Sequence, residues 1–150
     1  MTGVQTCALP IWGNAREDMN LRAMVRSAVL NDMRREFEAL AFSTGLDAWI
    51  KAVFACNAYI DEMAPWALRK TDPARMAEVL GTLYRCIADL AIGLLPIAPE
   101  SARRLLAGMG LAETDWNYGW IADGNPANPR AILQPTPLFP RLELPAEVAA

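Results

Sequence analysis

The sequence predicts an all-α protein, an antiparallel helical bundle with an extended, proline-rich C-terminal tail. Apolar side chains recur at helical spacing through three long segments between residues 16 and 95. Six of the eleven prolines lie between Pro126 and Pro145, where no helical period survives. Because 53% of the 150 residues are hydrophobic and 21% are charged, the chain can bury a core of its own.

The first helix is expected from Arg16 to about Leu40. Its charged residues lie largely away from an apolar face with i, i+3, i+4, i+7 spacing. That face consists of Leu21, Met24, Val25, Ala28, Val29 and Met33. Ser43-Thr44-Gly45 is expected to break the helix. Thr44, with Asp47 three residues later, resembles a capping box that opens the next helix.

The second helix is expected to end or kink at Ala64. Pro65 pushes the residue before it out of the α region and leaves the carbonyl of Asp61 without its usual partner. Trp66 should therefore leave in a new direction. The predicted inner face of this helix is Leu46, Trp49, Ile50, Val53, Phe54, Asn57 and Ile60.

The third helix has the strongest start signal, because Asp72 is a good cap residue and Pro73 suits the first helical position. Its apolar residues alternate steps of four and three, which is typical of a helix in a bundle. This seam is Met76, Leu80, Leu83, Ile87, Leu90 and Leu94. The residues expected on the solvent side are Arg75, Glu78, Arg85 and Asp89.

Three regions are expected along the chain. Residues 1–11 resemble the conceptual translation of a sequencing-adapter read-through, so we expect a non-native leader there. Residues 12–110 form the bundle, whose last short helix runs from Glu100 to Ala107 and closes at Gly108 or Gly110. Residues 111–150 form the tail, with a turn at 123–126. The tail must dock on another surface to bury Trp116, Trp120, Leu138 and Phe139.

Composition excludes several kinds of chemistry. The chain has no His, which excludes Ser-His-Asp and Cys-His nucleophiles and His-ligated zinc. Cys7, Cys56 and Cys86 show no close spacing, so we expect no metal site and a reduced, cytoplasmic setting. No apolar run is long enough to span a bilayer. With a net charge of −3, nucleic-acid binding must depend on a local patch, and we expect no DNA partner.

The segment from Asn57 to Lys70 is the sharpest candidate site. It places a Trp after a helix break, followed by Arg69, Lys70 and Arg75 against Asp72, a local charge of +2. A flat aromatic ring beside cations suits a single-stranded nucleic acid. The alternative is that Trp66 fills the core and the basic residues lie on a solvated turn. The residues alone favour this alternative.

This segment resembles the signature of the anticodon-binding helical bundle of methionyl-tRNA synthetase, a class I aminoacyl-tRNA synthetase. The order of later segments is also similar to the family: residues 71–75, 94–102 and 137–141. The resemblance covers roughly residues 36–143. It implies a bundle that lacks its first helix here. It also implies a bare apolar face on residues 44–63 or 73–95.

The resemblance implies that Trp66 stacks on an anticodon base. It implies that the other residues of the site support this segment or contact the tRNA backbone: Asn57, Asp61, Arg69, Lys70 and Arg75. Asn57 and Asp61, one turn apart, are expected to hold its shape. The sequence departs from the family at Ala58, where a basic residue is usual.

The resemblance also implies the partners, which are the tRNA(Met) anticodon and a catalytic domain of the same polypeptide. ATP and Mg²⁺ would bind in that domain, so this chain needs no cofactor, contains no catalytic residue and should be inactive alone as a ligase. The alternative function is a non-catalytic helical module for protein–protein interaction. In that case the 76–94 seam and the aromatic tail would bury against a partner.

Overall fold

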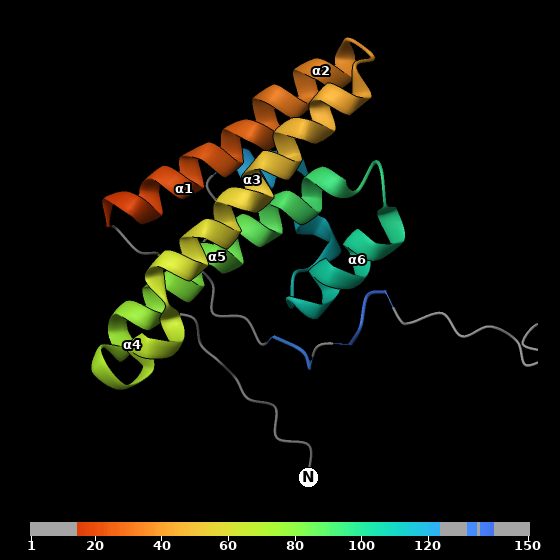
Figure 1. Ribbon diagram of the computed structural model, residues 1–150. Coiled ribbons are helices and arrows are strands. Elements are labelled where there is room, and N and C mark those ends of the chain that lie inside the picture. The colour runs from red at the N-terminus through yellow and green to blue at the C-terminus, as the bar shows by residue number, and fades with distance from the viewer. Residues whose placement is uncertain (1–14, 124–131, 135, 140–150) are drawn as a thin grey trace, which may run out of the picture.

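The computed structural model describes residues 15–123, 132–134 and 136–139. Over these residues it is a helical bundle without strands, which confirms the all-α prediction (Figure 1). The elements in chain order are α1 (Arg16–Ser27), the π-helical η1 (Ala28–Met33), α2 (Arg34–Glu38), α3 (Phe42–Met63), α4 (Pro65–Thr71), α5 (Pro73–Leu94), α6 (Pro99–Gly108), the 3₁₀ turn η2 (Glu113–Asp115) and α7 (Tyr118–Ala122).

The predicted first helix is confirmed as α1, η1 and α2, which follow one another with helical backbone angles at both junctions. Five of the six predicted inner residues are buried. The prediction for Met24 is wrong, because its side chain is exposed next to the buried Val25. Successive side chains on a helix point about 100° apart, so Met24 lies outside the buried stripe centred near Val25, whereas the smaller neighbours Ala28 and Val29 are both buried.

The predicted break at residues 43–45 is wrong. Leu40 adopts a left-handed conformation with φ of 60°. The Ala41 N–H donates to the Glu36 carbonyl (2.8 Å), and the Leu40 N–H donates to that of Phe37 (3.0 Å), as in a Schellman motif. α3 therefore begins at Phe42, and no side chain caps it, so the capping box at Thr44 is also wrong.

Gly45 lies inside α3 because α2 and η1 approach it closely. A Cβ atom there would lie 2.5 Å from two ring carbons of Phe37 and 3.2 Å from the Met33 carbonyl oxygen. The glycine that resembles a helix breaker in the sequence is thus a packing residue that brings two helices together.

The inner face of α3 is rotated from the predicted one. It consists of Gly45, Ala52, Cys56 and Tyr59. Trp49 is half-buried, and its Nε1 donates to the Leu90 carbonyl at 2.9 Å. Ile50, Phe54 and Asn57 are exposed, which contradicts the prediction. Three of these four inner residues are small, and the large apolar residues Ile50 and Phe54 are exposed instead.

α5 is the central helix and packs against α1, α3, α4, α6 and α7. Its predicted start is confirmed, because the Asp72 carboxylate accepts the Arg75 N–H at 3.0 Å. Ile87 is exposed, contrary to the predicted seam. Arg85 and Asp89, predicted on the solvent side, are only 3% and 4% exposed. α1 and α7 cover that side, and the Arg85 guanidinium lies 5.3 Å from the centre of the Trp120 ring.

Residues 111–123 depart from the expected extended tail. Gly110, with φ of 74°, closes α6 as predicted, and α7 follows with the Asn117 side chain accepting the Trp120 N–H at 2.9 Å. Leu111, Trp120 and Ile121 are buried in the core. The chain's own η1 and α5 supply the surface on which α7 packs, and Arg26 of α1 donates to the Ala122 carbonyl.

The described part of the remaining tail lies against α6. The Leu133 N–H donates to the Gly108 carbonyl at 2.9 Å. Arg104 donates to the carbonyls of Pro137 (3.0 Å) and Leu138 (3.2 Å). Most of the predicted turn at 123–126 and the 1–11 leader lie outside the described residues. The proposed division at residue 110 stays a prediction.

Gly45→Ala should destabilise the fold by about 1–3 kcal/mol, because the new methyl group overpacks the contact with Phe37. Urea unfolding monitored by circular dichroism measures the change. Gly108→Ala is the matched control: no atom lies within 4 Å of a Cβ there, so the free energy of unfolding should stay equal or rise slightly. Equal stability of the two variants would contradict this role of Gly45.

Burial of Asp89 raises the pKa of its carboxyl to about 7, despite the nearby charges of Arg85, Arg26 and Arg22. The folded state therefore binds this proton more tightly than the unfolded state does. Stability should fall as pH rises from about 4 to 7, by up to roughly 1.4 kcal/mol per pH unit. Urea unfolding across this range should show a flatter profile for Asp89→Asn.

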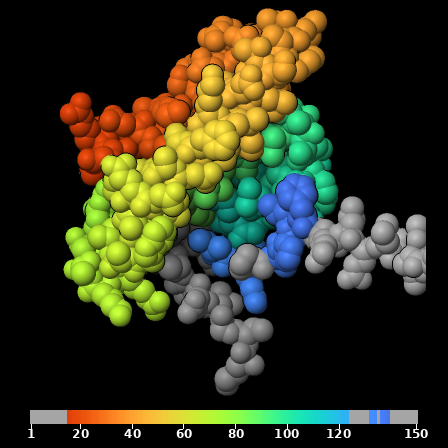
Figure 2. All heavy atoms as spheres, viewed as in Figure 1, coloured from red at the N-terminus to blue at the C-terminus, as the bar shows by residue number. Residues whose placement is uncertain are grey.

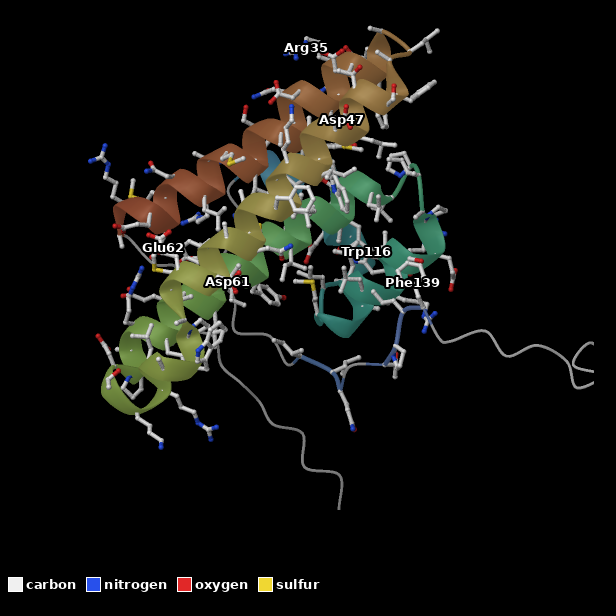
Figure 3. All side chains as sticks on the ribbon, viewed as in Figure 1. Arg35, Asp47, Asp61, Glu62, Trp116 and Phe139 are labelled. Atoms are coloured by element: carbon white, nitrogen blue, oxygen red, sulfur yellow. The ribbon has the colours of Figure 1, made fainter. Side chains whose placement is uncertain are left out.

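Asp47→Asn is the control for this titration, because Asp47 is an exposed carboxylate on α3 (Figure 3). It should keep the wild-type slope. The prediction would be contradicted if the free energy of unfolding of the wild type stayed constant or rose between pH 4 and 7.

Candidate nucleic-acid interface

The chain turns sharply between α3 and α4. Ala64 is left-handed, with φ of 42° and ψ of 59°, and Pro65 is the first residue of α4. The Ala67 and Leu68 N–H groups donate to the Ala64 carbonyl, at 2.8 and 3.4 Å. This geometry confirms the predicted helix end. Pro65 is buried, whereas the next residue, Trp66, is 64% exposed. The interpretation of Trp66 as a core residue is therefore wrong.

Two cations share the exposed side of α4 with Trp66. Arg69 and Lys70 follow it by three and four residues, so all three side chains lie on one face of the helix. Both basic residues are exposed in the last turn of α4. The predicted patch of one aromatic ring and two positive charges thus exists on the surface.

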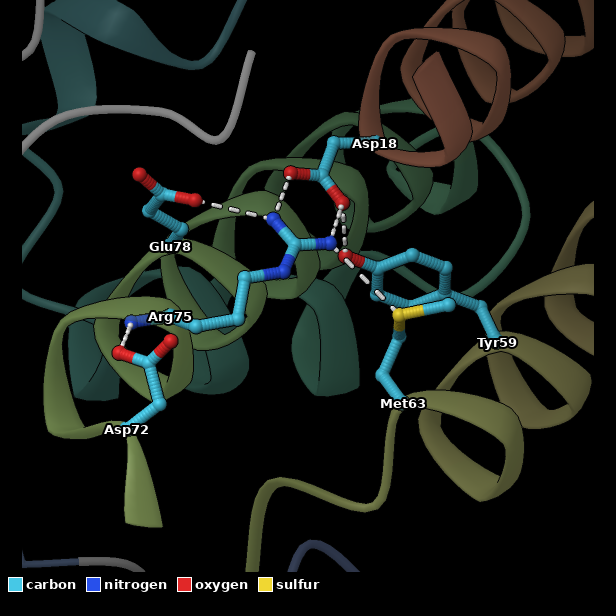
Figure 4. Close-up of polar contacts among 6 residues, drawn as sticks. All are labelled: Asp18, Tyr59, Met63, Asp72, Arg75 and Glu78. Atoms are coloured by element: carbon cyan, nitrogen blue, oxygen red, sulfur yellow. Dashed lines mark hydrogen bonds and ion pairs between the residues drawn. The ribbon is translucent and has the colours of Figure 1, made fainter. Parts of the chain in front are cut away.

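The third predicted cation, Arg75, points into the bundle (Figure 4). Its Nη1 and Nη2 atoms contact the two carboxylate oxygens of Asp18 at 2.5 and 2.8 Å, and Nη1 also contacts Glu78 at 3.0 Å. The Tyr59 hydroxyl donates to Asp18 Oδ1 at 2.5 Å. Among its predicted roles, these contacts favour support of the segment over contact with RNA.

Electrostatics keep this cluster charged at neutral pH. Burial alone would raise the pKa of Asp18, but hydrogen bonds from Arg75 and Tyr59 bring it below its ordinary value of 3.8. Burial and the bond to Asp18 raise the pKa of Tyr59. The hydrogen bond to Asp18 raises the pKa of Arg75. The carboxylate is thus ionised and the phenol remains a donor.

Asp18 and Tyr59 were not identified as site residues from the sequence. A signal for Asp18 exists: it lies three residues before Leu21 and seven before Val25, on the buried face of α1. A carboxylate in an apolar stripe implies a buried partner, although the sequence does not say which residue it is. Arg75, 57 positions later, is that partner.

Asn57 and Asp61 lie one turn apart on α3, as predicted, and both are exposed. Asp61 is labelled in Figure 3. Within the described residues, neither side chain makes a hydrogen bond or an ion pair. No side-chain bond of Asn57 or Asp61 among the described residues therefore supports their expected role in holding the segment's shape.

An apolar groove of about 350 Å³ lies between α3, α5 and α6, and Leu138 and Phe139 of the tail also line it (Figure 2). Its large apolar walls include Trp49, Val53, Ile60, Leu90 and Leu105. The outward residues Ile50 and Phe54 follow the same helix. Residues 44–63 therefore carry exposed apolar side chains beside the groove, but the chain's own tail also lines it, and a bare apolar patch larger than that of an ordinary monomer stays a prediction.

Two other features bear on possible functions. In residues 15–123, 132–134 and 136–139, no cluster of three His, Cys, Asp or Glu side chains could hold a metal ion. Over the same part of the chain, no helix has both the length and the apolar character needed to cross a bilayer.

Comparison with known proteins adds independent information. The family described as the anticodon binding domain of methionyl tRNA ligase matches residues 12–132. Methionine–tRNA ligase of Streptococcus pyogenes serotype M3 (strain SSI-1) is 34% identical over 129 residues, which are 84% of this chain and 19% of that protein. The Rickettsia conorii (strain ATCC VR-613 / Malish 7) enzyme is 41% identical over 88 residues, 58% of this chain and 17% of that protein.

Solved structures have the same fold. The free-state crystal structure of Mycobacterium tuberculosis methionyl-tRNA synthetase matches 92% of this chain with a TM-score of 0.81 and 28% sequence identity. This match covers 28% of that longer chain. The present chain spans about a fifth of the length of the curated relatives.

Proposed function

The chain belongs to the family of methionyl-tRNA ligase anticodon-binding domains, and from this premise we propose that Trp66 stacks on an anticodon base of tRNA(Met). The observation that carries the proposal is the ring of Trp66, 64% exposed on a helix whose same face carries Arg69 and Lys70. An anticodon loop presents unpaired bases, and stacking of one base on an aromatic ring contributes about 1–3 kcal/mol.

Charge supports the same surface. The chain as a whole is acidic, with a net charge of −3, so its overall field repels RNA. Arg69 and Lys70 supply a local positive charge next to the ring, where the loop phosphates would lie. Asn57 and Asp61 are proposed as supporting residues, and Arg75 supports the site through its buried contacts.

We extend the proposal to the protein that contains this domain. It would attach methionine to tRNA with ATP and Mg²⁺, and both would bind outside this chain. In support, the relatives named methionine–tRNA ligase extend well beyond the matched segment, which is 19% of the Streptococcus pyogenes serotype M3 protein. The same proposal places the protein in the cytoplasm, where translation takes place.

A second candidate function, protein–protein interaction, is favoured by the apolar groove between α3, α5 and α6. The two functions are compatible if the groove contacts another part of the same polypeptide, which is the partner that we propose for it. An interaction module without RNA binding would use the groove and leave Trp66 unoccupied.

Trp66→Ala in the full-length ligase should weaken binding of a tRNA(Met) anticodon stem-loop by roughly 5- to 150-fold, the equivalent of one lost stacking contact. Trp66→Phe should retain most of the affinity, because a smaller ring still stacks. Fluorescence anisotropy with a labelled CAU stem-loop measures both. A second stem-loop with a changed anticodon reports discrimination.

Phe54→Ala is the matched control, because Phe54 is an aromatic residue of nearly equal exposure, 65%, on the outward face of α3. It should leave stem-loop affinity unchanged. Affinity and discrimination that are unaffected by Trp66→Ala would refute the stacking role.

The double variant Arg69→Gln, Lys70→Gln should reduce the salt dependence of stem-loop binding. Each phosphate contact to a single strand contributes about 0.7 to the slope of log K against log salt concentration, so the slope should become shallower by about 1.4. Binding titrations from 50 to 300 mM KCl test this, because the Debye length falls by more than half over this range.

The double variant Arg34→Gln, Arg35→Gln is the charge-matched control, because both arginines pair with carboxylates on α2, at the opposite end of the bundle from α4 (Figure 1). It should leave the slope unchanged. Equal slopes for the Arg69→Gln, Lys70→Gln variant and the wild type would show that Arg69 and Lys70 lie away from the RNA backbone.

A further inference from the structure

We propose that Asp18, Tyr59 and Arg75 are positioning residues, which together fix the orientation of α4 and hence of the exposed Trp66 ring. The link to anticodon recognition rests on the function proposed above. The geometric claim concerns the free protein, and the experiments below test the two separately.

α4 has little intrinsic means of holding its own orientation. It has seven residues, far fewer than an isolated helix needs to be stable in water. It packs against α5 at the end of the bundle (Figure 1). Trp66, Arg69 and Lys70 face solvent, so contacts on that side do not restrain it. Its direction therefore depends on its buried side, where Pro65 and Leu68 pack against the bundle, and on how its two ends are attached.

Both ends of α4 are attached to Arg75. Met63 immediately precedes the left-handed Ala64, and its sulfur accepts a hydrogen bond from Arg75 Nη2 at 3.6 Å. Asp72 immediately follows α4, and its carboxylate accepts the Arg75 N–H at 3.0 Å. One residue thus contacts the position before the turn into α4 and the position after its last residue (Figure 4).

Arg75 is in turn attached to the body of the bundle. Asp18 of α1 is 0% exposed, and it binds the guanidinium through both carboxylate oxygens. Two parallel bonds define the plane of the guanidinium as well as its distance. Tyr59, one turn before Met63 on α3, donates to the same carboxylate at 2.5 Å. Three helices therefore meet at this cluster beneath α4 (Figure 4).

A buried charge cluster of this kind provides geometry more than net stability. Apolar side chains of similar volume are often as stabilising as a buried ion pair, but they lack directional bonds. The exposed pair of Arg34 and Glu38, by contrast, has ordinary i, i+4 geometry and contributes little. Loss of one bond in the buried cluster should thus alter the orientation of α4 before it unfolds the bundle.

The first experiment uses ¹⁹F NMR of the 150-residue chain labelled with 5-fluorotryptophan, without RNA. The Trp66 signal is assigned by its loss in Trp66→Phe. Tyr59→Phe removes one hydroxyl and leaves the ion pair in place. It should shift or broaden the Trp66 signal and leave those of Trp49, Trp116 and Trp120 unchanged. Asp18→Asn should have a larger effect on the same signal.

Tyr84→Phe is the matched control, because it removes a tyrosine hydroxyl that donates to the Met109 carbonyl at 2.8 Å, on the α6 side of α5. It should leave the Trp66 signal unchanged. A Trp66 signal that is identical in Tyr59→Phe and the wild type would overturn the proposal. Equal changes in the signals of Trp49, Trp66, Trp116 and Trp120 would also overturn it, because they indicate a general structural role. If Asp18→Asn does not fold, Tyr59→Phe still decides the question.

The second experiment measures stem-loop affinity in the full-length ligase. Tyr59→Phe should reduce affinity at least threefold. The double variant Trp66→Ala, Tyr59→Phe should bind as weakly as Trp66→Ala alone, because the Tyr59 hydroxyl affects binding only through the position of the Trp66 ring. If the losses of affinity in the two single variants add up in the double variant, the proposal that Tyr59 acts by positioning Trp66 is overturned. If Trp66→Ala alone has no effect, the proposed function fails, whereas the NMR result on α4 still stands or falls independently.

Discussion

The candidate site depends on one constraint of the backbone, that α3 cannot continue through Pro65. Proline has no N–H for the next helical hydrogen bond, and its ring clashes with the preceding turn. The chain resolves this with a left-handed Ala64 and a new short helix whose first residue is Pro65. Without the turn, Trp66 would continue along α3. With it, the ring lies on a separate helix that is free to present one face to solvent.

The short helix divides its residues by role. Its solvent side carries the ring and the two cations that suit an unpaired base and its phosphates. Its ends meet Arg75, whose own charge is used inside the protein by Asp18 and Glu78. Two of the three cations counted in the sequence are thus available to a ligand. The exposed site is therefore less basic than the sequence indicates, because Arg75 forms contacts at the two ends of α4 instead.

Sequence reasoning succeeded where a backbone rule acts locally. Pro65, and Asp72 followed by Pro73, have unambiguous consequences for a helix, so these boundaries were predicted correctly. It failed where burial depends on neighbouring helices. Gly45 was interpreted as a breaker because its contact with Phe37 comes from another helix. Arg85 and Asp89 were assigned to solvent because α7, which covers them, was not anticipated. The pairing of Asp18 with Arg75 was missed because the two residues are 57 positions apart in the sequence.

The rotated inner face of α3 has a physical reason that also bears on function. Small side chains let helices approach closely, and three of the four residues with which α3 faces the core are small: Gly45, Ala52 and Cys56. Close packing inside leaves the large apolar residues Ile50 and Phe54 to the outside, beside the groove. A hydrophobic pattern cannot distinguish these two faces, since both are apolar. The size of the side chains does: the face with mostly small residues packs within this chain, and the large face is the one for which we propose contact with a further part of the polypeptide.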